Sequence, residues 1–308
     1  DVEIEFLIQS VYDNYKVIDH PEITLEANPD DLTKNRIIQL SKCPINRLSI
    51  GIQSFFEEDL RLMNRAHNAQ EAENCIEEAV QHFDNITIDL IYGIPGMNNE
   101  RWKANIQKAL DYGLPHISSY ALTVEPKTAL EKLIQKGTVP QVDDGQAQEQ
   151  FHILVDALES EGFVNYEVSN FGKSGYFSQN NTAYWQGKTY LGIGPSAHSF
   201  NHKTRHCNIS SNKKYIDGII NNNPYFEIEH LTENQQYNEY ILTSLRTMWG
   251  ADNLFIKNKF DLKTYKYFDL QVKKWEKQEK VIKKGSRYIL TSKGKLYADA
   301  IAADLFIV

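Results

Sequence analysis

Long apolar runs, paired cysteines and a secretion signal are all missing from this 308-residue chain. No stretch approaches the roughly 20 apolar residues that a membrane helix needs, so we expect no integral membrane segment. The first residues, Asp1 to Glu5, do not look like a signal peptide. Cys43, Cys75 and Cys207 are odd in number and far apart, which indicates a reducing, cytoplasmic compartment without disulfides. Each is more simply a buried apolar residue than a metal ligand.

Positive charge is also scarce, because the chain has 33 Lys and Arg against 41 Asp and Glu, a net charge of −8. This balance argues against nucleic acid as the main partner. The stretch from Lys257 to Lys295 is the exception and is rich in lysine. A solvated surface, or a patch for an acidic partner or heme propionates, is the simpler interpretation there, and DNA binding is the alternative. No Gly-x-Gly-x-x-Gly follows the first predicted strand, which disfavours dinucleotide binding.

Three short apolar segments each end in a polar side chain. The segments 22–26, 47–52 and 86–92 read as buried strands, and a fourth strand is predicted at 116–122. Helical patterns separate them, which indicates a parallel sheet. Glu26, Gln53 and Asp89 lie at or near the strand ends, and such ends meet at one edge of the sheet. The pattern predicts one polar ligand at the mouth of an α/β barrel, although connections of this length also fit an open doubly wound sheet.

The remaining segments predict a second kind of structure. Apolar residues at helical spacing begin at Ile4, so we expect a chain cut within a domain. Asn28-Pro29-Asp30 reads as a helix start. Residues 128–162 read as helical, 163–206 as strand and loop, and 221–224 as a linker. The stretch 231–308 shows helices near 232 and 261–277, a hairpin at 281–290 and a final helix, a pattern typical of a winged helix. We predict two domains, 1–230 and 231–308.

Seven motifs in order carry a resemblance to a known family. They are Leu25-Glu-Ala-Asn-Pro29, Arg47-Leu-Ser-Ile-Gly-Ile-Gln-Ser-Phe55, Asn64-Arg-Ala-His67, Asp89-Leu-Ile-Tyr-Gly-Ile-Pro-Gly96, Ser119-Tyr-Ala-Leu122, Tyr166-Glu-Val-Ser-Asn-Phe171 and Gly192-Ile-Gly-Pro-Ser-Ala-His-Ser199. The chain resembles the radical S-adenosylmethionine (SAM) enzymes related to oxygen-independent coproporphyrinogen III oxidase, and among them the HemW-type heme chaperones. The resemblance implies a partial barrel of six β/α units with a helical C-terminal domain.

Two segments of that family are absent from this sequence. The family has a strand with Cys-x-x-x-Cys-x-x-Cys, whose thiolates hold a 4Fe–4S iron–sulfur cluster, and a Gly-Gly-Gly-Thr-Pro turn. No pair among the three cysteines has this spacing. With the helical start, this favours a truncated chain that lacks the first barrel strands. A natural protein that lost its cluster is the alternative.

The resemblance also implies ligand contacts. SAM has a carboxylate, an ammonium, ribose hydroxyls and an adenine, so a guanidinium, carboxylates and an amide suit it. The matching positions are Glu26, Gln53, Arg65, Asp89, Ile91 and Ala121. Arg65 is expected at the SAM carboxylate, and Ile91 and Ala121 at the adenine. The alternative is that these strand-end residues are satisfied by local backbone, and that His67 caps the helix that follows.

The heme contacts implied by the resemblance are Tyr184, Trp185 and His198. The chaperone branch has His-Asn-x-x-Tyr-Trp where this chain has Asn180-Asn181-Thr-Ala-Tyr184-Trp185, so the usual histidine is an asparagine. Tyr184 and Trp185 are expected to stack on a porphyrin. His198 is the candidate iron ligand, with His202 and His206 as alternatives and ordinary loop histidines as the simpler interpretation. We read Gly192 and Gly194 as a close-approach turn and not as a phosphate cradle.

Three functions remain open on the sequence alone. The first is a cytoplasmic heme chaperone that binds SAM and heme and passes heme to a respiratory apoprotein. The second is oxygen-independent coproporphyrinogen III oxidase, which decarboxylates two propionates of its substrate. The third is a scaffold without catalysis that lost its cluster in evolution.

Overall fold

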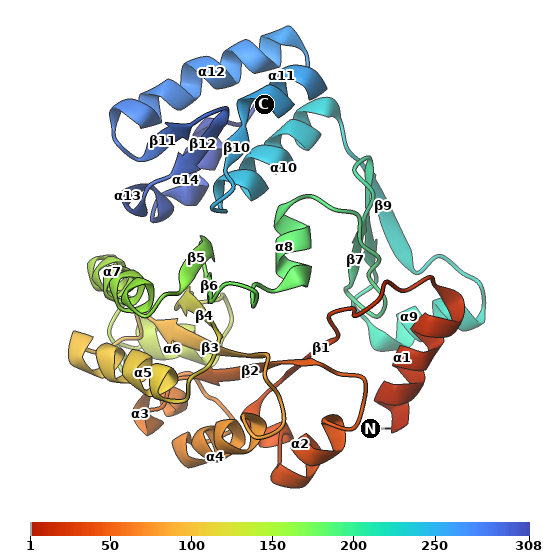
Figure 1. Ribbon diagram of the computed structural model, residues 1–308, viewed down its shortest axis with the longest axis vertical. Helices are drawn as coiled ribbons and strands as arrows, with labels where there is room; N and C mark the ends of the chain where they lie inside the picture. The colour runs from red at the N-terminus through yellow and green to blue at the C-terminus, as the bar shows by residue number, and fades with distance from the viewer. Residues whose placement is uncertain (1) are drawn as a thin grey trace. The chain divides into compact units, whose positions relative to one another are not determined.

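The computed structural model describes residues 2–308, and it divides into two compact units (Figure 1). The first unit holds the residues up to 165 together with 169–177, and the second holds 166–168 and 178–308. The predicted boundary at residues 230 and 231 falls inside the second unit, between β9 (Phe226–His230) and α10 (Glu233–Leu245). A domain division at that point stays a prediction.

A six-stranded sheet with the order β1-β2-β3-β4-β6-β5 organises the first part of the chain. Its strands are β1 (Thr24–Ala27), β2 (Arg47–Gln53), β3 (Ile86–Tyr92), β4 (His116–Ala121), β5 (Val164–Glu167) and β6 (Asn170–Gly172). The first four strands are parallel, and their ends lie within two residues of the predicted ones. The sheet is nevertheless mixed, because β6 runs antiparallel to β4. The α/β class and the parallel core are therefore confirmed.

Helices connect these strands. They are α1 (Val2–Asn14), α2 (Lys34–Leu40), α3 (Glu57–Leu62), α4 (Ala69–Ala79), α5 (Asn99–Asp111), α6 (Ala129–Gln135) and α7 (Asp144–Ser160). The predicted helix start at Asn28 is wrong, because Pro29–Asp31 form only a 3₁₀ turn and α2 begins after its N-cap Thr33. The helical stretch 128–162 is two helices, separated at Gly137, which has a left-handed φ of 72°.

The two faces of the sheet differ in chemistry because successive side chains of a strand point to opposite faces. Leu48, Ile50 and Ile52 on one face of β2 are fully buried. α5 and α7 pack against β3 on the apolar side, and Figure 1 shows these helices beside the sheet. The other face presents polar residues of the same strands. Burial of the apolar face thus fixes which side chains of β1 to β4 are left to form a site.

A three-stranded antiparallel sheet with the order β7-β8-β9 belongs to the second unit. It is built from β7 (His198–Phe200), β8 (Thr204–Asn208) and β9 (Phe226–His230), with α8 (Gln179–Trp185) before it and α9 (Asn212–Ile220) inserted. The prediction of strand and loop for 163–206 is wrong at α8. Ser178 starts that helix, since its Oγ accepts a hydrogen bond from Asn181 N at 3.3 Å.

The C-terminal part of the second unit has the predicted winged-helix pattern. α10 is followed by β10 (Ala251–Asp252), α11 (Asn253–Lys259), α12 (Leu262–Lys277), β11 (Val281–Lys284), β12 (Arg287–Leu290), α13 (Ser292–Lys295) and α14 (Ala298–Asp304). The strands pair in the order β10-β12-β11. Tyr237, Phe268 and Tyr288 are fully buried at the centre of one apolar cluster. Among the helices of residues 2–308, none has the length and apolar character needed to cross a membrane.

Candidate functional site

Polar side chains gather on one face of the parallel strands, near their carboxyl ends. The register pairs Glu26 of β1 with Ser49 of β2, and Asp89 of β3 with Ser118 of β4. Gln53 ends β2 opposite Leu90 of β3. Because alternation places every second residue on the same face, Glu26 and Asp89 point to the side away from the helices. The structure thus brings together two of the strand-end carboxylates that the sequence singled out.

Three polar groups of this face crowd around Gly51. A Cβ at Gly51 would lie 2.8 Å from Gln53 Nε2, 3.2 Å from Asn28 Oδ1 and 3.4 Å from Arg65 Nη2. The absent side chain therefore lets an amide, a carbonyl oxygen and a guanidinium approach the β2 backbone closely at this position. We call Gly51, Gln53, Asn28 and Arg65 the Gly51 cradle. Asn28 was missed from the sequence, although its place two residues after Glu26 was the available signal.

The backbone at Gln53 has an unusual conformation. Its φ is 67°, in the left-handed region that side chains other than glycine rarely adopt, and the register with β3 shifts between Ile50 and Gln53. Such a conformation costs on the order of 1 kcal/mol and is typical of ligand-binding positions. The shift turns the Gln53 amide toward Gly51, where the cradle lies.

Arg65 is held in place from both sides. Its Nη2 donates a hydrogen bond to Asn28 Oδ1 at 2.6 Å. Two residues along, the buried His67 has its Nε2 3.1 Å from the carbonyl oxygen of Ile52, which ties this segment to β2. The alternative that His67 caps the next helix is wrong, because Asn68 is the N-cap of α4 and forms a capping box with Glu71.

Asp89 carries an ionisable carboxyl within the polar face. Burial raises its pKa to about 6, and the negative charge of Glu26 adds to this rise. A hydrogen bond from Ser118 and the guanidinium groups of Arg47 and Arg65 act in the opposite direction. Two guanidinium groups and a second carboxylate therefore act on the Asp89 carboxyl. Such a mixture of charges suits a ligand that carries an ammonium and hydroxyl groups.

The two predicted adenine contacts do not lie on one face. Ile91 of β3 pairs with Tyr120 of β4, and Ala121 pairs with Tyr92. Ile91 is two residues beyond Asp89 and shares its face, whereas alternation places the Ala121 side chain on the opposite face. Ala121 is at the end of its strand and exposed, so its backbone is the part that remains available to a ligand.

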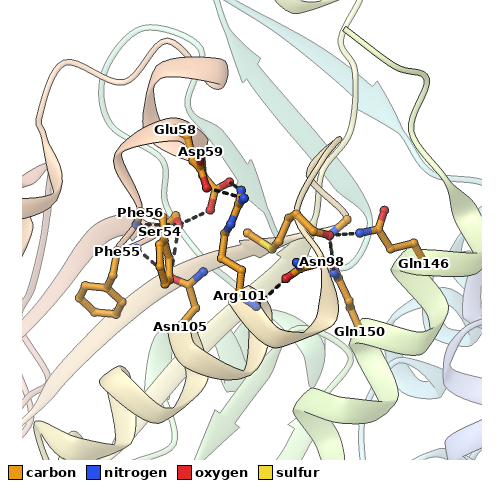
Figure 2. A network of polar contacts seen from close by, with 12 residues as sticks. Ser54, Phe55, Phe56, Glu58, Asp59, Asn98, Arg101, Asn105, Gln146 and Gln150 are labelled. Atoms are coloured by element: carbon orange, nitrogen blue, oxygen red, sulfur yellow. Dashed lines mark hydrogen bonds and ion pairs between the residues drawn. The ribbon is translucent and has the colours of Figure 1, made fainter.

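A buried polar network supports the loop after Gln53 (Figure 2). Asn105 Oδ1 of α5 accepts a hydrogen bond from Phe55 N at 2.7 Å, and Ser54 Oγ donates to Asp59 Oδ2 at 2.7 Å. Arg101 Nη1 is 2.9 Å from Asp59 Oδ1. Burial raises the Asp59 pKa, while the hydrogen bonds from Ser54 and Arg101 lower it. The network holds the segment directly after Gln53 in place and so helps to fix the orientation of the Gln53 side chain.

A second set of contacts fixes the loop after β3. Gln150 of α7 accepts a hydrogen bond from Gly93 N at 2.7 Å, and its Nε2 donates to the carbonyl oxygen of Met97 at 3.1 Å. Figure 2 shows Gln150 and Gln146 side by side on that helix. Hydrogen bonds with Gln150 of α7 therefore hold both ends of the Gly-Ile-Pro-Gly turn in place.

The predicted heme residues lie in the second unit, where they face different neighbours. Tyr184 of α8 lies against Tyr190, with ring centroids 4.2 Å apart, and Tyr190 stacks on Phe200 of β7 at 5.9 Å. Trp185 faces the Arg246 guanidinium at 5.4 Å from its ring centroid. Tyr184 is therefore part of an aromatic row with Tyr190 and Phe200, and Trp185 is not.

His198 lies on β7, the strand that contributes Phe200 to the aromatic row. It is exposed, and Phe200 lies two residues further on the same face of the strand. Of the alternative ligands, His206 stacks on Phe226 at 5.2 Å, and His202 lies edge-on to Phe200 at 5.4 Å. A Cβ on Gly192 would lie 2.1 Å from the carbonyl oxygen of His198, so the predicted close approach at this glycine is confirmed.

Residues 2–308 contain no group of three or more His, Cys, Asp or Glu side chains arranged to hold a metal ion. Cys43 and Cys75 are buried in the first unit and Cys207 is partly exposed in the second. The side chains described here therefore do not fit an iron–sulfur cluster. The Gly51 cradle and the polar strand ends, in contrast, fit SAM.

Comparison with known proteins identifies the superfamily of the first unit. Residues 2–109, which contain the Gly51 cradle and Asp89, match the radical SAM superfamily. The fold resembles that of coproporphyrinogen III oxidase (HemN) from Escherichia coli, with a TM-score of 0.81 over 99% of this chain and 74% of that one at 21% identity. The first unit is thus a radical SAM domain.

The particular family follows from sequence relatives over most of the chain. The heme chaperone HemW of Bacillus subtilis is 32% identical over 285 residues, which are 92% of this chain and 75% of the relative. HemW of Lactococcus lactis is 29% identical over 95% of this chain and 77% of its own length. The chain belongs to the HemW family of the radical SAM superfamily.

Proposed function

We propose that this chain is a heme chaperone that binds SAM in the first unit and heme in the second, and delivers heme to a respiratory apoprotein. The similarity to heme chaperones over nearly the whole chain carries the proposal. The Gly51 cradle supports the SAM part, and the aromatic row beside His198 supports the heme part. The cytoplasm is the proposed location, because the cysteines are unpaired.

Each polar group of the first site has a role toward SAM. Arg65 binds the SAM carboxylate, since a guanidinium donates two parallel hydrogen bonds to such a group. Gln53 and Asp89 bind the ribose hydroxyls, and Glu26 meets the ammonium or a hydroxyl. Ile91 lies on the same face as Asp89 and covers the adenine, which the Ala121 backbone borders. In the radical SAM superfamily an iron–sulfur cluster supplies the reductive cleavage of SAM.

The second site presents a row of aromatic rings beside candidate iron ligands. Tyr184, Tyr190 and Phe200 offer ring faces for a porphyrin, because aromatic rings stack in offset arrangements 4.5–7 Å apart. Tyr184 is 43% exposed, so its ring is accessible to a ligand from solvent. His198 adds an imidazole to the same surface. Trp185 lies outside the aromatic row, with its ring against the Arg246 guanidinium, and its contact with heme stays a prediction.

The oxygen-independent coproporphyrinogen III oxidase remains the second candidate. The fold alone supports it, because the solved HemN structure is 21% identical to this chain. A chaperone must release its ligand to another protein, whereas an oxidase must convert its substrate. The experiment that separates them is anaerobic incubation with SAM, a reductant and coproporphyrinogen III, alongside transfer of hemin from the loaded chain to a heme-free respiratory cytochrome.

The expected result is hemin transfer without decarboxylated product. Decarboxylation that depends on SAM would instead assign the chain to the oxidase. Tyr184→Ala is the matched variant, since it removes one ring of the aromatic row and should slow loading with hemin. Tyr297→Ala is the control, because Tyr297 is a comparably exposed tyrosine near the C-terminus that contacts Lys280.

A further inference from the structure

Cys207 and His198 lie side by side on neighbouring strands of the small antiparallel sheet. The register pairs His198 of β7 with Cys207 of β8, so both side chains point to the same face. Their Sγ and Nε2 atoms are 3.7 Å apart, within reach of a weak S–H···N hydrogen bond. Phe200 is two residues from His198, about 6.6 Å along the strand and on the same face. A thiol, an imidazole and an aromatic row therefore share one accessible surface.

Cys207 differs from the other two cysteines in accessibility. Cys43 and Cys75 are buried, and burial raises the pKa of Cys75 to about 12. Cys207 is partly exposed. Thiolates are strong ligands for ferric iron and bind heme in one large class of heme proteins. The sequence alone does not show that Cys207 lies beside His198, because this depends on the register of β7 with β8.

We propose that Cys207 binds the iron of heme as a thiolate and that His198 takes up the thiol proton. This inference rests on the proposed heme function and changes the assignment of the iron ligand within it. On binding, the Cys207 S–H bond breaks, an S–Fe bond to ferric heme forms, and the proton moves to His198 Nε2. No electron is transferred. The porphyrin ring then extends over Phe200 and Tyr190 on the same face.

Charged groups of the same sheet surround this pair. Glu227 of β9 lies opposite Cys207, and in the next row Arg205 of β8 lies between Phe200 and Glu229. Arg205 forms an ion pair with Glu229 at 3.6 Å. His206, next to Cys207 in the sequence, points to the opposite face and stacks on Phe226.

The test titrates ferric hemin and iron-free protoporphyrin IX into the full chain and into three variants. In Cys207→Ser the absorption and electron paramagnetic resonance signature of thiolate-bound ferric heme should disappear, and the hemin Kd should rise at least tenfold. Protoporphyrin IX affinity should not change, because it has no iron to bind. His198→Ala should keep the thiolate signature and shift its formation to higher pH. His206→Ala, the control on the opposite face, should match the wild type.

The outcomes separate this inference from the proposed function. A wild-type hemin spectrum without the thiolate signature, which changes in His198→Ala but not in Cys207→Ser, would make His198 the ligand and overturn the assignment, with heme binding intact. A hemin spectrum unchanged in both variants would also overturn it. Failure of the wild-type chain to bind either porphyrin would instead remove the proposed heme function itself.

Discussion

Closing the Gly51 cradle with a single methyl group is the most direct perturbation of the SAM site. In Gly51→Ala the new Cβ would lie 2.8 Å from Gln53 Nε2, which is too close, so the amide must move. The atom is the far end of a flexible side chain, and Gly51 does not have a left-handed φ. The free energy of unfolding should therefore change by less than about 1 kcal/mol.

The effect on SAM should be much larger. The methyl group occupies the space beside Asn28 and Arg65 and displaces Gln53, so at least one charged or two neutral hydrogen bonds to the ligand are lost. Such losses cost about 1.5–3 kcal/mol, which corresponds to a roughly 10- to 150-fold rise in Kd. Isothermal titration calorimetry with SAM measures this directly, and urea denaturation measures the stability of the same samples.

Ile52→Val is the matched control for this experiment. Its side chain is fully buried on the opposite face of β2, so the substitution should cost about 0.5–1.5 kcal/mol of stability and leave SAM binding unchanged. Gly51 has no role in SAM binding if Gly51→Ala binds SAM as tightly as the wild type, or if Ile52→Val weakens SAM binding to the same extent.

Three further predictions concern the same unit. Arg65→Ala should weaken SAM by about 1.5–3 kcal/mol in calorimetry, as expected for the loss of a charged contact, and unchanged affinity would remove Arg65 from the site. The Asp89 carboxyl has a pKa of about 6 in the fold and about 4 when unfolded, so folding takes up a proton between these values and the free energy of unfolding should fall as pH rises from about 4 to 6. Asp89→Asn should remove that fall in denaturant titrations at a series of pH values, and an identical pH profile would contradict the assignment. Asn105→Ala leaves the Phe55 N–H without its partner and should destabilise the fold by about 1–3 kcal/mol, measured by urea denaturation; a cost near zero would show that the network does not support this loop.

The sequence predicted the parallel strands well because their signal is local. Apolar residues of β2 and β3 alternate with polar ones, and each strand ends beside glycine or a polar residue. That pattern also placed Glu26, Gln53 and Asp89 near the strand ends. Arg65 was identified through the family resemblance alone, since no periodicity marks a residue in a connecting segment.

Features that depend on long-range pairing were not predictable in this way. Asn28 joins the cradle only because Arg65 reaches back across 37 positions to bind it. The opposite faces of Ile91 and Ala121 follow from the register of β3 with β4. The short helix α8 was missed, because seven residues with three polar amides give no clear period. The Cys207–His198 pair needs the hairpin register, which a turn around Asn201 does not reveal.

Hemin titration of the purified chain is the decisive measurement of heme chaperone function. We expect saturable binding of one hemin per chain, weakened by Tyr184→Ala, followed by transfer of the bound hemin to a heme-free respiratory cytochrome. Binding that does not saturate, or that is the same in the Tyr184 variant, would leave the chain as a SAM-binding member of its family without a heme site in the second unit.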